Sequence, residues 1–78
     1  MSIRTTRSEI RSYVKQGYAK DITYMKAEDI KEIHKNENYF DEVAYSMGTY
    51  GVNGLLLKGH NTGNMYAITN RTTAIYLV

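Results

Sequence analysis

Apolar side chains recur at helical spacing in the first half of the chain. Thr6 and Glu9 have the spacing of an N-terminal capping box, and Gly17 is a natural helix stop, so we expect a helix over about residues 7–16. The same period predicts a second helix over about residues 26–36, which ends near Asn36 and Asn38. The predicted inward positions are Ile10, Tyr13, Val14 and Tyr18 in the first helix and Ala27, Ile30 and Ile33 in the second.

From residue 40 onward the apolar period changes to two, which is typical of β-strands. Val43, Tyr45 and Met47 alternate with smaller residues in a first predicted strand, and further strands are predicted at residues 55–58, 65–69 and 72–78. A loop at residues 59–63 joins two of these strands as a hairpin. We therefore expect one domain over residues 1–78 with an α+β fold. In this fold two N-terminal helices pack on an antiparallel three- to four-stranded β-meander at residues 40–78.

Two apolar runs predict strands that are covered on both faces. Residues 55–57 are three consecutive leucines and residues 74–78 are all apolar or aromatic, whereas a strand with one solvated face would alternate. The helix pair is the expected cover on one face, which leaves the other face for a second copy of the chain. Self-association would also support so small a domain, which buries only about 60% of the surface of its unfolded chain. We therefore expect a homodimer or a larger assembly, with Leu57 and Ile75 as oligomer contacts.

Charge is confined almost entirely to the front of the chain. Residues 1–42 carry eight basic and eight acidic side chains, whereas residues 43–78 carry no acid and only Lys58 and Arg71 as bases. The formal net charge of +2 is too small to indicate nucleic-acid binding by itself. The first residues contain no apolar signal core, and no apolar run approaches the ~20 residues of a membrane-spanning helix. We expect a soluble cytoplasmic protein without a membrane partner.

Four basic residues form a stripe along the first predicted helix. Arg4, Arg7, Arg11 and Lys15 are spaced by three, four and four, which places them within roughly 80° of one another at 100° per residue. A helix that presents cations in this way can bind phosphates or an acidic protein surface. The same pattern also fits a solvated helix face that keeps a small fold soluble.

A second feature is the segment rich in tyrosine and glycine at residues 45–54. Exposed tyrosines between small residues provide rigid contact area at little entropic cost, so this segment is a candidate protein interface. The residues concerned are Tyr45, Gly48, Tyr50, Gly51 and Gly54. Glycine-rich β-bulges that merely bend a sheet have the same composition. The chain has eight tyrosines but no tryptophan, so we expect several tyrosines on the surface.

The residue types for catalysis and metal binding are sparse. His34 and His60 are isolated, cysteine is absent, and no histidine pair or acidic cluster has the spacing of a metal site. The glycines lack the sequence of a phosphate-binding loop, and no nucleophile has a nearby base. We therefore expect a non-enzymatic protein with no cofactor, no metal and no catalytic residue.

The run AYSMGTYGVNG at residues 44–54, followed by TGNMYAI at residues 62–68 and by Arg71, resembles small uncharacterised proteins of phages and mobile genetic elements of Gram-positive bacteria. KDIT at residues 20–23 is a weaker match, and the resemblance covers most of the chain. No activity is established for that group, so the resemblance assigns no site residues. It implies a setting in which short proteins bind and block a host machine, such as a CRISPR or other defence effector.

Three hypotheses for the function follow. The first is a non-enzymatic protein-binding protein of phage or mobile-element origin that inhibits a host machine. The second is a small nucleic-acid-binding accessory or regulatory protein that uses the basic stripe. The third is a self-assembling structural protein whose sheet is the oligomer contact.

Overall fold

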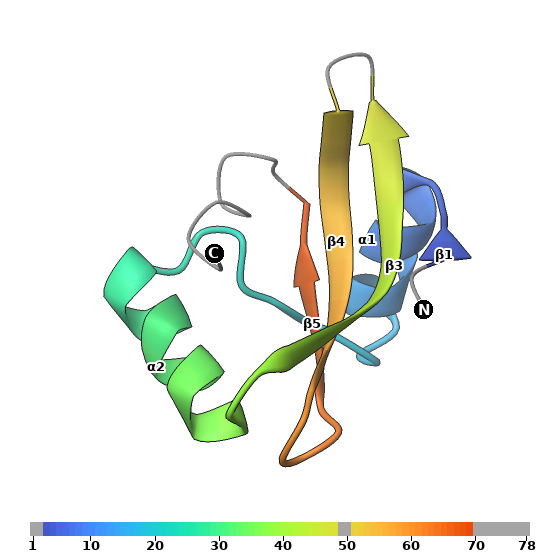
Figure 1. Ribbon diagram of the computed structural model, residues 1–78. Helices are drawn as coiled ribbons and strands as arrows, with labels where there is room; N and C mark the ends of the chain where they lie inside the picture. Colours follow the sequence, from blue (N-terminus) through green and yellow to red (C-terminus); the bar gives the residue numbers. More distant parts are fainter. Residues whose placement is uncertain (1–2, 49–50, 70–78) are drawn as a thin grey trace.

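A mixed β-sheet forms the centre of the protein in a computed structural model, which describes residues 3–48 and 51–69 (Figure 1). In chain order its elements are β1 (Ile3–Arg4), α1 (Arg7–Lys15), β2 (Lys20–Asp21), α2 (Ala27–Glu37), β3 (Phe40–Gly48), β4 (Gly51–Gly59) and β5 (Met65–Ile68). Within these residues the sheet has five strands in the order β1-β3-β4-β5-β2. Both helices are therefore confirmed to within about one residue at each end.

The expected fold is wrong in two respects, and the first concerns the sheet. Strands β3, β4 and β5 do form an antiparallel meander, but the sheet is mixed, because a parallel strand flanks the meander on each side. Strand β1 pairs Ile3 with Ala44, and β2 pairs Lys20 with Tyr66. Each of these edge strands has only two residues, which is too short to show a period of two in the sequence. The strand expected at residues 72–78 lies outside the described residues.

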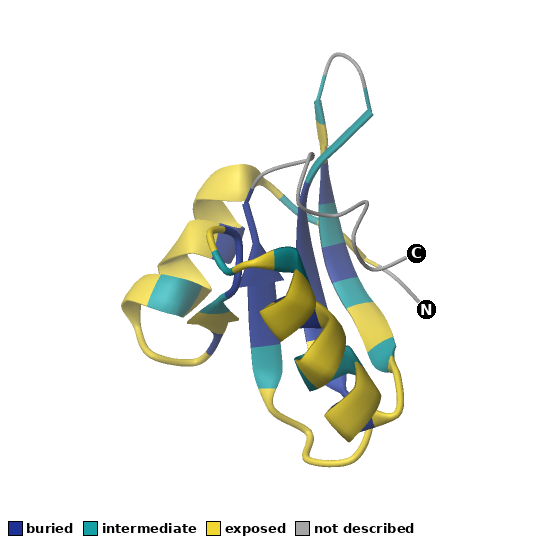
Figure 2. Ribbon diagram, turned by 90° about the vertical axis from the view of Figure 1, so that its left-hand side faces the viewer, coloured by how far each residue is buried: buried dark blue, intermediate teal, exposed yellow. Residues whose placement is uncertain are grey.

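The second correction concerns the helices, which lie on opposite faces of the sheet. Ile10 of α1 packs in a cluster with Leu56 of the sheet, whereas Ile30 of α2 packs with Leu55 and Leu57 on the other face. Both helices turn exposed surfaces outward on either side of a buried sheet (Figure 2). The consecutive leucines are indeed covered on both faces. Their covers are α1 and α2, not a helix pair and a second copy of the chain.

Helix α1 begins and ends at strong local signals. The Thr6 side chain accepts a hydrogen bond from the backbone N–H of Glu9 at 3.1 Å, which is the N-terminal cap. At the other end Gly17 has φ of 83°, and the backbone N–H groups of Gly17 and Tyr18 donate to the carbonyls of Val14 and Tyr13. These two bonds are those of a Schellman motif, so the chain leaves α1 in a defined direction toward β2.

Gly54 allows α1 to approach the sheet closely. A Cβ atom on this buried residue would lie 3.0 Å from the carbonyl oxygen of Ile68 and 3.4 Å from Cδ1 of Ile10. The register of β3 and β4 shifts beside it, between Ser46 and Met47, which agrees with the alternative interpretation of this segment as a β-bulge. The position of α1 on the sheet therefore depends on the absence of a side chain at residue 54.

Candidate functional site

The outer face of α1 carries an exposed row of basic side chains. Arg7, Arg11 and Lys15 follow one another at intervals of one helical turn, and all three are exposed. Glu9 is the only acid among residues 1–20, and its carboxylate accepts a hydrogen bond from the Thr5 hydroxyl. We call Arg7, Arg11 and Lys15 the α1 basic row.

Positive and negative charge are divided between successive parts of the chain. Residues 1–20 carry five bases and one acid, a formal charge of +4, and residues 21–42 carry three bases and seven acids, a formal charge of −4. The first part contains α1, and the second contains Asp21 of β2, which lies beside α1, as well as α2 and the start of β3. Because α1 and α2 lie on opposite faces of the sheet, the net charge of +2 conceals a basic side around α1.

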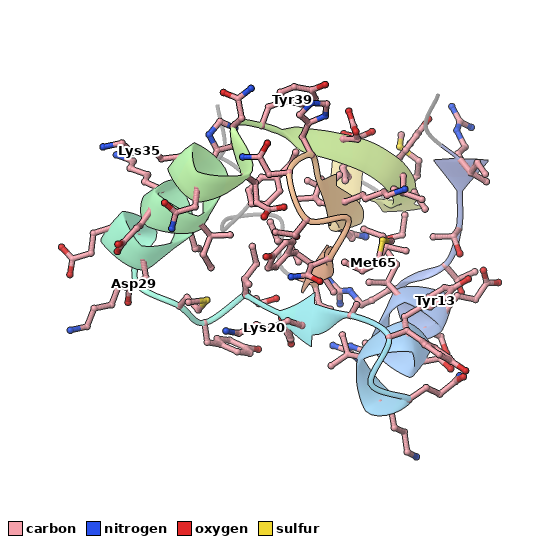
Figure 3. All side chains as sticks on the ribbon, turned by 90° about the horizontal axis from the view of Figure 1, so that it is seen from below. Tyr13, Lys20, Asp29, Lys35, Tyr39 and Met65 are labelled. Atoms are coloured by element: carbon pink, nitrogen blue, oxygen red, sulfur yellow. The ribbon has the colours of Figure 1, made fainter. Side chains whose placement is uncertain are left out.

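Exposed tyrosines lie on two different sides of α1. Tyr13 at the end of α1 is 45% exposed and Tyr18 just after it is 64% exposed, and their rings meet edge to face with centroids 6.4 Å apart. At 100° per residue Tyr13 lies roughly 160° from Arg11 around the helix, so this pair is on the side of α1 away from the basic row. Tyr24 after β2 is 87% exposed and lines a hollow together with Arg11 and Lys15. Figure 3 shows Tyr13 on the α1 side of the molecule, far from Asp29 and Lys35 on α2. The expectation of surface tyrosines is confirmed, although Tyr13 and Tyr18 were both expected to face inward.

Hollows border the side of the molecule around α1, and two of them reach the segments that follow it. One of ≈ 320 Å³ lies between α1 and the segment that joins β2 to α2. Its lining residues are Arg11, Val14, Lys15, Asp21, Tyr24 and Thr69. The other, of ≈ 420 Å³, is lined by the loop after α1 and by the start of β5, with Ile33 of α2. The first of these hollows joins two members of the basic row to an exposed aromatic ring.

Arg4 does not belong to the helix, although the stripe was expected to include it. It lies on β1 beside Tyr45, and its Nε donates a hydrogen bond of 3.1 Å to the Tyr45 hydroxyl. The guanidinium also lies 5.9 Å from the centroid of that ring. The hydrogen bond to Tyr45 raises the pKa of the exposed Arg4 side chain, so its positive charge is retained. The structure thus joins one residue of the basic stripe to one residue of the tyrosine and glycine segment.

The members of the tyrosine and glycine segment have different positions in the hairpin of β3 and β4. Gly48 and Gly51 pair across its end, and Gly51 has φ of 119°, which favours glycine. Gly54 is buried under α1, so its role is to admit the helix. Tyr45 is half-buried against the core, and Tyr50 lies outside the described residues. A contact role for Tyr45, Gly48 and Gly51 stays a prediction.

The residues expected at an oligomer contact are not exposed in the described part of the chain. Leu57 is 4% exposed and belongs to the core on the α2 side of the sheet, whereas Ile75 lies outside the described residues. A charge at residue 57 would therefore unfold the single chain and would not report on assembly. Self-association itself stays a prediction, which light scattering over a range of protein concentrations can test.

Sequence reasoning missed a buried carboxylate at the end of α2. Glu37 is 3% exposed, and its Oε2 accepts a hydrogen bond of 3.0 Å from the Thr62 hydroxyl. The carboxylate lies against Gly59, where any Cβ atom would overlap it. Next to it the rings of Tyr39 and His60 stack with centroids 4.0 Å apart. Glu37 thus connects the end of α2 to the turn between β4 and β5. In the sequence it looks like any exposed glutamate of a helix, so its burial could not be predicted.

His34 packs edge to face against Phe40, so both histidines contact aromatic rings. Within residues 3–48 and 51–69, no group of three or more histidine, aspartate or glutamate side chains is arranged to hold a metal ion. The same residues contain no helix with the length and apolar character needed to cross a membrane.

Comparisons with protein-family models, with curated proteins and with solved structures found no match.

Proposed function

We propose that this protein acts by binding, and that the face formed by the α1 basic row and Tyr24 binds an acidic surface of another protein. The observation that carries the proposal is the exposure of all three cations on one side of α1, with the exposed Tyr24 in the same hollow as Arg11 and Lys15. Cations on this face attract and orient an acidic partner. A tyrosine beside them supplies rigid contact area, which is typical of protein interfaces.

The distribution of charge favours a protein over a nucleic acid as the main partner. Three helical cations neutralise few phosphates, so they support only weak binding to a duplex. Residues 21–42, with a formal charge of −4, would repel a long phosphate backbone that wraps around the molecule. A compact acidic patch on a protein meets only the α1 side. The resemblance to small phage and mobile-element proteins favours a bacterial host protein as this partner, and inhibition of a CRISPR or other defence effector is the proposed outcome.

A pull-down from a bacterial host with nuclease treatment tests this function. We expect the wild-type protein to retain one predominant acidic protein after nuclease treatment. A triple variant, Arg7→Ala, Arg11→Ala and Lys15→Ala, should lose it. The matched control removes three exposed lysines around α2, Lys26, Lys31 and Lys35, and hence the same charge. If both triple variants lose the partner equally, net charge and not the α1 face is responsible, and the proposal is wrong.

The second candidate function is a nucleic-acid-binding accessory or regulatory protein. The observation that favours it is the hollow that combines Arg11 and Lys15 with the exposed ring of Tyr24, since single strands bind surfaces that combine charge with aromatic platforms. A gel shift with duplex and single-stranded probes at about 50 mM salt tests it, because phosphate contacts are strongest at low salt. No shift with either probe under those conditions would exclude this candidate.

A further inference from the structure

The hollow of ≈ 320 Å³ beside α1 has two walls of different chemistry. On the α1 wall, Arg11 and Lys15 lie one turn apart with the half-buried Val14 between them in sequence. On the opposite wall stands Tyr24, whose side chain is 87% exposed although it lines the hollow. The hollow therefore combines an aromatic ring that is open to solvent with two cations.

Hydrogen bonds hold the wall that carries Tyr24 in place. Asp21 Oδ1 accepts a bond of 2.9 Å from the backbone N–H of Thr23 and another from the Thr23 hydroxyl. The Thr23 hydroxyl lies 3.1 Å from that of Thr69 and accepts a bond of 2.8 Å from the Thr69 backbone N–H. Thr23 is buried at 4% exposure. The residue before Tyr24 is therefore fixed to the sheet, so the ring stands on a rigid base.

We propose that this hollow binds a nucleotide, either as a free nucleoside phosphate or as one unit of a single-stranded nucleic acid. The phosphate lies between Arg11 and Lys15, which supply guanidinium and ammonium donors. The base stacks on Tyr24, because every base offers a π-face to an aromatic side chain. The volume is at the lower end of the range for small-ligand sites and suits a ligand of one nucleotide.

Asp21 determines which end of the nucleotide faces α1 and which end faces β2. Its carboxylate also lines the hollow, and it repels a phosphate from the β2 wall toward the two cations of α1. On its own side it can accept a hydrogen bond from an exocyclic amino group, as carboxylates do with cytosine. A single acidic side chain that enters the hollow would satisfy Arg11 and Lys15, but it would leave Tyr24 without a stacking partner and would face Asp21. The observations therefore favour a nucleotide over a peptide carboxylate.

The proposal goes beyond protein binding and uses only part of the same face. Protein binding by the α1 basic row depends on Arg7 as much as on Arg11, since both are exposed on it. Nucleotide binding in the hollow depends on Arg11 and Tyr24, whereas Arg7 and Tyr18 do not line it. The two proposals can therefore fail separately.

Titration of the full chain followed by NMR tests the hollow, with four probes: cytidine monophosphate, a short oligo-dC, inorganic phosphate and a short peptide of glutamates. We expect Tyr24→Ala to weaken nucleotide binding by about tenfold, and Tyr24→Phe to keep it, because stacking needs only the ring. Arg11→Ala should weaken it by a similar factor, while the matched controls Tyr18→Ala and Arg7→Ala should change it by less than about twofold. The exposure of all four side chains lets each variant fold, which thermal unfolding verifies.

Each outcome decides the proposal. Binding of both nucleotide and oligo-dC supports a general nucleotide site, and binding of oligo-dC alone supports a site for single strands. Phosphate or the glutamate peptide binding as tightly as the nucleotide would overturn the proposal in favour of a simple anion site. Equal losses in Tyr24→Ala and Tyr18→Ala, or no binding of either nucleotide probe at low salt, would also overturn it.

Discussion

Helices α1 and α2 cover opposite faces of one sheet, yet they pack on it and carry charge in different ways. Ile10 of α1 rests among short side chains, including Ala44 and Ala67, directly over the strands. Ile30 of α2 rests on a thicker layer of large side chains, among them Phe40 and Tyr66. Helix α1 therefore lies close to the backbone of the sheet, whereas α2 is separated from the backbone by a layer of large side chains.

Charge separates the helices as well. Along α2, Glu28 and Lys31, and Glu32 and Lys35, are opposite charges at intervals of three residues, so its cations have neighbours of opposite sign on the same helix. The α1 basic row has no acid at such intervals, because Glu9, the acid of this helix, lies two residues from Arg7 and from Arg11 and six from Lys15. The difference indicates that α2 is a structural cover, whereas α1 also presents charge that a partner can neutralise.

Truncation of the central isoleucine of each helix should have the largest effect on stability. We expect Ile10→Ala to lower the free energy of unfolding by about 4 kcal/mol and Ile30→Ala by about 2 to 3 kcal/mol, within the range for such cavities. Besides Leu56, Val14 and Met65, the cluster around Ile10 offers only alanines, which cannot fill the cavity. The cluster around Ile30 consists of larger side chains, and Met25 and Ile33 beside it can move into the cavity. Urea unfolding measures both values. A larger loss for Ile30→Ala would contradict the proposed difference in packing.

Removal of the buried carboxylate of Glu37 should destabilise the attachment of α2 next most. Glu37→Ala leaves the Thr62 hydroxyl without its acceptor and opens a void over Gly59, so we expect a loss of about 1 to 3 kcal/mol. Glu37→Gln should lose less, because its amide oxygen can still accept from Thr62. Glu32→Ala, on the exposed side of the same helix, is the matched control and should stay within about 0.5 kcal/mol of the wild type. Equal losses for Glu37→Ala and Glu32→Ala would show that the buried contact contributes nothing.

Addition of a methyl group at Gly54 should test the close approach of α1. Because the new Cβ would lie 3.0 Å from the Ile68 carbonyl oxygen, we expect Gly54→Ala to cost about 1 to 3 kcal/mol. Ile10→Val removes the Cδ1 methyl that this Cβ would meet, so the double variant should lose less than the sum of the two single variants. Additive losses would mean that the helix does not limit residue 54. Gly17→Ala is the comparison, because its cost of about 1 to 2 kcal/mol comes from its positive φ with open space around it.

The N-terminal caps should give the smallest effects, with opposite signs in the two helices. Thr6→Ala removes the side-chain cap of α1 and should cost about 1 kcal/mol. The corresponding position of α2 is Lys26, which makes no capping hydrogen bond, so Lys26→Ser should add about 0.5 to 1 kcal/mol. Thermal unfolding detects both changes. A loss of stability in Lys26→Ser would indicate that the Lys26 side chain makes a contact that stabilises the fold by more than a serine cap does.

Part of the proposed binding face could be predicted from the sequence. Arg7, Arg11 and Lys15 share a helix, and an interval of four places them on one side whatever the helix packs against. The hollow could not be predicted in the same way. It exists because β2 pairs with β5, which brings Asp21 and Tyr24 beside α1. That pairing involves only two residues in each strand, which is too few to produce a recognisable alternation of apolar and polar residues in the sequence.

The sequence by itself determined where α1 begins and ends, because the Thr6 cap and the Gly17 stop act within a few residues of the chain. The end of α2 was also a local matter, because Asn38 adopts the positive φ that asparagine tolerates. The sequence also determined that the leucines of β4 are covered on both faces, because three adjacent apolar side chains must point both ways. Only the tertiary structure decided which element covers which face, the parallel edges of the sheet and the burial of Glu37. Each of these depends on a contact between residues far apart in the chain, such as Glu37 with Gly59 and Thr62, and no local preference encodes the choice of partner.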